Sequence, residues 1–395
     1  MNPFLPTVTE FLAGLLWIAA LEVCVLVPLI ALAARLCGSA WQAARIWKAG
    51  LYALLLTPLA TALLPHCYVF YAGRREPVPF PSLRLPGTVI WPARLARDVV
   101  GVSPEQSYRV LVWLWGIVAA VRVFQLAHGW RTAVQLLRSG RPVRDRRVRE
   151  LLDELPCGVQ LRDVSVLVVP SVPMAACWRL QRPTVLLSPE LYRLPWPELR
   201  MVLTHEFAHL CQNHSLAMFA SSICSILYWF HPLVFWTVRQ FHRWAELACD
   251  EYVLANVGEP RAYAALLARL SLEGNGNTAV AKQPLGTFLD SSLRPLERVR
   301  WVLQHSQPLR ASCWPNIGAV IALGLLLLSQ CIVALGRLDV AHTSLVHGRM
   351  VWTAWPTCTA RIADLFGVAL RDYPLDAFRY DASATAEPSP ASEGR

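Results

Sequence analysis

The feature that most restricts the fold of this chain is an uninterrupted apolar run over residues 11–34. Crossing the hydrocarbon core of a bilayer takes about 20 residues of helix, so this run is long enough. Lipid offers no hydrogen-bond partners, and a single segment there can satisfy its backbone groups only as a helix. No basic segment precedes the run and no small-residue cleavage site ends it. We therefore expect a membrane helix and not a cleaved signal sequence.

Three further apolar runs predict membrane helices at about 49–71, 109–128 and 317–335. A chain with 55% hydrophobic and only 16% charged residues is too apolar for an ordinary soluble enzyme. Its net charge of +10 comes largely from arginines beside the apolar runs, which suits an anionic lipid surface. We therefore predict an α-helical membrane protein with four transmembrane helices that contacts the bilayer and does not bind nucleic acid directly.

Arginine placement predicts the orientation of the chain. A dense group of arginines between Arg131 and Arg149 follows the third run, and such groups concentrate in cytoplasmic loops. A proline-rich loop at about 72–106 is predicted outside, although its own arginines oppose that rule. We expect a multi-pass protein of the inner (plasma) membrane. Residues 1–128 form a three-helix membrane part with the external proline-rich loop, and residues 129–315 form a cytoplasmic domain. A fourth membrane helix at 316–335 and a short external tail at 336–395 follow.

His205, Glu206 and His209 form a His-Glu-x-x-His motif. Pro197 and Glu198 precede apolar residues at three-and-four spacing, a pattern that predicts the start of a partly buried helix. Residues four apart share one helical face, so both imidazoles can bind one metal ion with Glu206 beside it. Two imidazoles and one further protein ligand hold Zn²⁺ and leave one coordination position open for water, and the carboxylate takes the proton of that water as it attacks a peptide carbonyl.

A second predicted helix supplies the remaining candidate residues, Glu246 and Asp250, again four apart. Glu246 can complete the ligand set, and Asp250 can orient one of the histidines. His214 competes for the third ligand position. On a continuing helix, however, it is rotated by about 500° from His209 and should point away from the histidine face. Cys249 is expected to pack in the core and not to bind metal.

The nearly apolar segment 215–240 lies between the two halves of this site. As one straight helix it would be about 39 Å long and would carry Glu246 far from the motif. We therefore predict a turn near His231 and Pro232 that makes 215–240 a buried or re-entrant hairpin, with His231 as a cap or core group.

A small sheet is expected before the motif helix. Valine and leucine alternate with turn residues at 164–169 and 184–187, which favours strands, and a helix is expected near 143–155. The edge strand of such a sheet could hold an extended substrate through backbone hydrogen bonds.

Two later segments, Tyr228–Leu233 and Glu246–Glu251, add to the evidence of the motif. With them, the chain resembles the BlaR/MecR-type membrane metallopeptidases over about residues 105–335. The resemblance implies an α+β zincin-like (gluzincin) domain with His205, His209 and Glu246 as zinc ligands and Glu206 as the catalytic base. One position departs from the family pattern, because His214 stands where the family commonly has Asp. Related proteases that cut prenylated proteins can carry His there.

The resemblance also implies an activity, a zinc-dependent endopeptidase that cuts a cytoplasmic protein in signal transduction, such as a penicillinase-repressor-type transcriptional repressor. The antibiotic sensors of this family end in a penicillin-binding domain with a Lys-Thr-Gly strand. No such domain is expected here, since no lysine follows Lys282.

Two alternatives stay open. One is a membrane quality-control or prenyl-protein-type protease, and the other is a non-catalytic receptor or scaffold with a structural zinc site. Glu206 argues against the second, because a structural site needs no base. A monomer and a homodimer both stay open.

Cys67 and Cys358 are the two cysteines that the four-span topology places outside, where disulfides persist. A disulfide between them and two unpaired thiols both stay open. The chain has 11 cysteines and no C-x-x-C pair, so most of the others are expected to be structural or inert.

Overall fold

A computed structural model describes the chain over residues 8–63, 66–71, 104–157, 164–172, 175–180, 182–276, 295–305, 324–329, 340–342 and 350–353. The chain divides into two compact units. The first comprises Met1–Glu22, Pro58–Trp113 and Ser329–Arg395, and the second comprises Val23–Thr57 and Leu114–Leu328. All the candidate ligands of the metal site therefore belong to the second unit.

Three long helices cover the first three predicted spans: α1 (Val8–Arg35), α2 (Ala40–Leu63) and α4 (Pro104–Ser139). The prediction for the second span is wrong at its end, because residues 66–71 form strand β1 (His66–Tyr71). Pro65, which lacks a backbone N–H, stands between the helix and the strand and does not favour a continuous helix. Only residues 324–329 of the fourth predicted span are described, and they are helical.

Within the described residues, one helical segment, Arg109–Ser139 of α4, is long and apolar enough to cross a membrane. Its apolar side chains are unusually exposed for a folded protein: Ile117 is 59% exposed, Val121 52% and Phe124 72%. Large exposed apolar surfaces mark contacts with lipid or with other proteins. This helix also runs beyond the predicted end at residue 128.

The first unit contains a small sheet that the sequence did not predict. Strand β1 pairs in parallel with β6 (Val340–His342) and antiparallel with β7 (Met350–Thr353). Cys67 lies opposite Trp352 in this register. The predicted partner of Cys67, Cys358, lies outside the described residues.

The second unit contains a four-stranded mixed sheet of order β2-β3-β5-β4, built from β2 (Arg141–Pro142), β3 (Ser165–Val168), β5 (Thr184–Leu187) and β4 (Ala175–Trp178). The predicted strands at 164–169 and 184–187 are confirmed as β3 and β5, which run parallel. On one face of the sheet, Ala176 and Leu186 pack with Leu136 and Leu137 of α4. The opposite face, which includes Val185, belongs to the core that contains the motif helix.

Two short helices and the motif helix complete this part of the core. The predicted helix near 143–155 is confirmed as α5 (Arg146–Glu154), where the Asp145 side chain accepts a hydrogen bond from the backbone N–H of Arg147. Helix α6 (Pro189–Tyr192) follows β5 directly. Helix α7 (Trp196–Cys211) then carries the His-Glu-x-x-His motif and is buried along most of its length. A helix that is buried on all sides acts as the centre of its domain.

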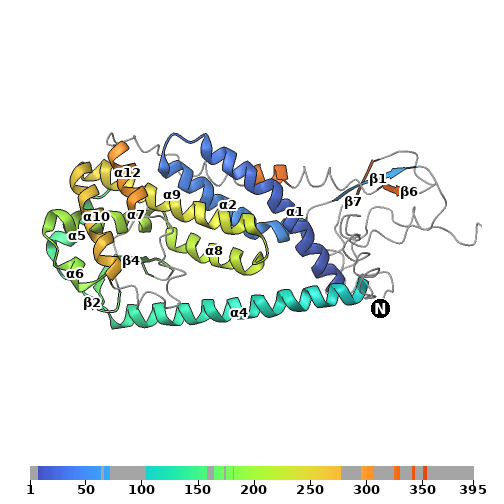
Figure 1. The fold of residues 1–395 in the computed structure, drawn as a ribbon, viewed down its shortest axis with the longest axis horizontal. Coiled ribbons are helices and arrows are strands. Elements are labelled where there is room, and N and C mark those ends of the chain that lie inside the picture. Colours follow the sequence, from blue (N-terminus) through green and yellow to red (C-terminus); the bar gives the residue numbers. More distant parts are fainter. Residues whose placement is uncertain are drawn as a thin grey trace, which may run out of the picture. The chain divides into compact units, whose positions relative to one another are not determined.

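The chain reverses direction within segment 215–240, as predicted. Helix α8 (His214–Leu227) ends before a short turn, and α9 (Pro232–Asn256) runs back beside it, as Figure 1 shows. Tyr228 in the turn is fully buried, and its hydroxyl donates to the carbonyl of Leu54 in α2 over 3.1 Å. His231 is a buried core residue whose Nε2 lies 3.6 Å from Cys24 Sγ. Helices α10 (Pro260–Gly276) and α12 (Pro295–Gln304) pack against each other beside α9.

Candidate metal centre

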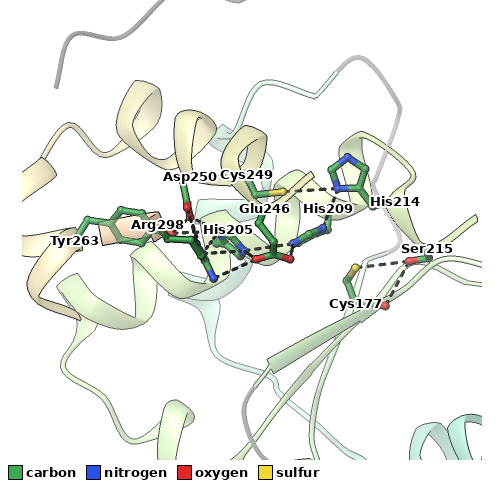
Figure 2. A network of polar contacts seen from close by, with 10 residues as sticks. All are labelled: Cys177, His205, His209, His214, Ser215, Glu246, Cys249, Asp250, Tyr263 and Arg298. Carbon is green, nitrogen blue, oxygen red and sulfur yellow. Dashed lines mark hydrogen bonds and ion pairs between the residues drawn. The ribbon is translucent and has the colours of Figure 1, made fainter. Parts of the chain in front are cut away.

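Helices α7 and α9 bring three of the predicted ligand groups together (Figure 2). His205 Nε2 lies 3.3 Å from His209 Nε2, and each of these atoms lies 3.5 Å from an oxygen of Glu246. Ligand atoms about 2.0–2.1 Å from a tetrahedral zinc ion are separated by about 3.3–3.4 Å. The two imidazole nitrogens therefore have the mutual spacing of zinc ligands, and the two oxygens of Glu246 lie at a similar distance, Oε2 from His205 and Oε1 from His209.

Glu206 is buried on α7 next to His205, with 8% of its surface exposed. Burial raises the pKa of its carboxyl group to about 7; the charge on Glu246 adds to the increase, while His205 and Arg298 oppose it. A carboxyl group with a pKa near the working pH is suited to accept and return a proton. The predicted role of Glu206 as a base is compatible with this environment.

The Nδ1 atom of His205 faces a buried carboxylate, as predicted for Asp250. Nδ1 lies 3.2 Å from Asp250 Oδ1 and 3.1 Å from the hydroxyl of Tyr263 on α10. The same hydroxyl donates to Asp250 Oδ1 over 2.7 Å. A carboxylate behind a metal-binding histidine fixes the orientation of the ring. The sequence places Tyr263 only on an amphipathic helix, and its spacing gives no sign of this contact.

Arg298 on α12 is the main site residue that the sequence does not reveal. Its guanidinium makes a two-pronged contact with Asp250, with Nε at 2.9 Å from Oδ2 and Nη2 at 2.6 Å from Oδ1. Nη1 lies 3.1 Å from Glu246 Oε2. Although burial alone would raise the pKa of Glu246, the neighbouring Arg298 and the two histidines lower it to about 2. An arginine on a basic amphipathic helix looks like a surface residue until the helix is placed.

The continuing helix on which the placement of His214 was predicted is wrong, and His214 contacts His209. Helix α7 ends at Cys211, and Asn213 adopts a left-handed conformation with φ of 56°. Asparagine tolerates that conformation better than most residues. The break starts a new helix at His214 and returns its imidazole to the site, where its Nδ1 lies 2.8 Å from His209 Nδ1. Burial lowers the pKa of His214 well below its usual value, so the ring is neutral.

The charges of the site fit a bound divalent cation. Two buried carboxylates, those of Glu246 and Asp250, form ion pairs with the guanidinium of Arg298, and a third, Glu206, is buried on α7. With all three ionised and both motif histidines neutral, as metal binding requires, these groups carry a net charge of −2, and uncompensated buried charge is costly. A divalent cation bound by the two imidazoles and Glu246 would neutralise this negative charge.

Cys249 offers a different third ligand. Its Sγ atom and a ring nitrogen from each of His205 and His209 lie within 4.8 Å of one another. Burial raises the pKa of the Cys249 thiol well above its ordinary value, and only the thiolate binds metal well. Glu246 is ionised, and its oxygens lie 3.5 Å from the two Nε2 atoms, so we favour Glu246. The expectation that Cys249 only packs in the core stays a prediction.

Among the described residues, Cys157 and Cys211 form a disulfide that the sequence did not predict. Cys157, just after α5, is bonded to Cys211 at the end of α7, with a Cα–Cα distance of 5.7 Å. These two cysteines therefore have a structural role. The bond fastens the end of the motif helix to the neighbouring α5 segment.

A buried His-Glu-x-x-His helix, a carboxylate from a following helix and a small mixed sheet together define the class of helix-borne metallopeptidase sites. Residues 15–294 match the family model described as BlaR1 peptidase M56, which is more than half of the chain. The chain belongs to this peptidase family, and the predicted resemblance is confirmed. No curated protein matches the chain. The family match ends before Arg298, so the helix that supplies this arginine lies beyond it.

Proposed function

We propose that this chain is a membrane-embedded zinc endopeptidase that cuts a cytoplasmic regulatory protein. The observation that carries the proposal is the convergence of His205 Nε2, His209 Nε2 and the Glu246 carboxylate at 3.3–3.5 Å, with Glu206 beside them. Membership in a peptidase family supports proteolysis. Zinc is the metal that two imidazoles and one carboxylate commonly bind in peptidases.

The chain's own residues would perform the proton transfers. When bound, zinc polarises the substrate carbonyl and makes water a stronger acid. Glu206 accepts a proton from the water whose oxygen attacks the carbonyl carbon. It then returns that proton to the peptide nitrogen as the carbon–nitrogen bond breaks. Arg298 and Asp250 hold Glu246 and His205 in position and do not exchange protons.

The sheet beside the motif helix offers a place for the substrate backbone. Strand β4 lies at the edge of the four-stranded sheet, and α7 contacts β4. An extended peptide added to this edge would gain main-chain hydrogen bonds without needing a particular sequence. This suits cleavage within a protein segment that is locally unfolded. The family resemblance favours a transcriptional repressor of the penicillinase-repressor type as the substrate.

Four membrane helices with a cytoplasmic peptidase domain remain our proposed topology. The pairing of β1 with β6 and β7 supports it, because residues 66–71 and the tail must then lie on the same side of the membrane. The four-span arrangement places both of these segments outside. The exposed apolar side chains of α4 support contact with lipid.

Replacing Glu206 by glutamine tests the proposed function. The amide cannot accept the proton, so Glu206→Gln should retain the metal and lose cleavage by at least about 100-fold. Metal content is measured by elemental analysis of the purified full chain, and accumulating proteins are identified in cells by mass spectrometry.

The proteins that accumulate distinguish the alternatives. One stabilised repressor supports the proposal, whereas many misfolded membrane proteins would support the quality-control alternative. Unchanged cellular output, with the metal retained, would show that the chain acts as a receptor or scaffold and would refute the proposed activity.

A further inference from the structure

His214 is placed to control the orientation of one metal-binding histidine. It is fully buried, and its Nδ1 atom lies 2.8 Å from His209 Nδ1. The other nitrogen of His209, Nε2, faces His205 Nε2 and Glu246. The first residue of α8 thus contacts the side of the His209 ring that points away from the proposed metal position, as Figure 2 shows.

At this short distance, one of the two nitrogens must donate a proton and the other must accept it. A neutral imidazole carries one N–H, and a metal ligand must present a lone pair. If His209 Nε2 presents its lone pair to the metal, His209 Nδ1 carries the proton and donates it to His214 Nδ1. The proton of His214 then lies on its own Nε2, which is buried and has no hydrogen-bond partner among the described residues.

We propose that His214 is a positioning residue for the metal centre, which accepts the His209 Nδ1 proton and so fixes the tautomer that presents Nε2 to the metal. This inference rests on the proposed function, because it assumes that His209 binds a metal. The buried, unpaired N–H of His214 is the energetic cost of this arrangement. That cost would be hard to explain if His214 only filled space beside Phe241, its ring neighbour at 5.9 Å.

Three substitutions separate an acceptor role from a packing role. The Oδ1 atom of asparagine can occupy roughly the place of histidine Nδ1, whereas the amide of glutamine reaches nearer to Nε2. His214→Phe keeps an aromatic ring and removes the acceptor. We expect His214→Asn to bind zinc within about 3-fold of wild type, and His214→Gln and His214→Phe to bind it about 10- to 100-fold more weakly.

The experiment uses the full chain in detergent, with zinc affinity measured by chelator competition. Cobalt(II) in place of zinc gives a visible spectrum that reports ligand geometry, and we expect it to change in the phenylalanine variant and not in the asparagine variant. His231→Phe is the matched control, since His231 is also buried but contacts Cys24. Thermal unfolding of the metal-free proteins separates a loss of metal affinity from a loss of folding.

Wild-type affinity in His214→Phe would overturn the inference, and so would an asparagine variant as weak as phenylalanine. If the phenylalanine variant does not fold, the asparagine and glutamine variants still decide between the two roles. Failure of the wild-type chain to bind zinc would instead refute the proposed function itself, and with it this inference.

Discussion

The two histidines of the motif lie on one helix, yet their surroundings differ. His205 is backed by a charged network that comes from distant parts of the chain, with Tyr263 58 residues away and Arg298 93 residues away. His209 is backed by the neutral imidazole of His214, only five residues away. One side of the centre therefore depends on long-range packing of α9, α10 and α12, and the other on the local break between α7 and α8. The comparison predicts that damage to the two sides will have different consequences.

The largest effect is expected from removing the group that both histidines share. Glu246→Ala deletes the third ligand, so zinc binding and proteolysis should be lost together. Metal content and cleavage of a substrate are measured on the same purified sample. Cys249→Ala is the control, and we expect it to retain zinc. If the cysteine variant loses the metal and Glu246→Ala keeps it, the third ligand is the thiol.

Breaking the charged side should cost both folding and metal affinity. Asp250→Ala leaves Arg298 buried without its main partner, and we expect a loss of about 3–5 kcal/mol of stability together with weaker zinc binding. Thermal and denaturant unfolding of the metal-free protein measures the first effect.

A double variant sharpens this prediction. Arg298→Met combined with Asp250→Ala removes both charges and should recover part of the lost stability. No recovery in the double variant would mean that the ion pair is not the source of the effect.

The disulfide at the end of α7 is expected to stabilise the junction between α7 and α8, which positions His214 beside His209. By loop-closure entropy, a bridge across 54 residues stabilises the fold by up to about 4 kcal/mol. Cys157→Ser should therefore lower the stability of oxidised protein by as much as this, and should leave reduced protein nearly unchanged.

The redox state of this bridge in cells also tests the proposed topology. Disulfides seldom persist in the cytosol, so a peptidase domain that faces the cytoplasm should be isolated with both thiols reduced. Alkylation during lysis followed by mass spectrometry detects this. A fully oxidised pair in fresh cells would place the domain outside and contradict the cytoplasmic orientation.

The smallest effect is expected from a single hydroxyl on the charged side. Tyr263→Phe removes one hydrogen bond to Asp250 but leaves the carboxylate held by Arg298, so stability should fall by about 1–2 kcal/mol. Zinc affinity should change less than in His214→Phe, since His205 retains Asp250. If Tyr263→Phe loses more zinc affinity than His214→Phe, the proposed difference between the two sides is wrong.

Much of the site could be predicted because helical spacing is local. The four-residue spacing of His205 and His209, and of Glu246 and Asp250, places each pair on one face of its helix regardless of the rest of the fold. The apolar segment between them had to reverse for the pairs to meet, and α8 and α9 confirm that reversal. The strands at 164–169 and 184–187 were likewise visible in the alternation of apolar residues.

The sequence alone thus determined which residues share a helical face and that the chain folds back between the two helices, because these features depend on short-range periodicity. Only the tertiary structure decided what stands behind each histidine. A left-handed residue at Asn213 returns His214 to the site, and the docking of α12 buries Arg298 against Asp250. Helical spacing encodes neither outcome. The first depends on where helix α7 ends, and the second depends on a long-range contact that forms only when the elements pack.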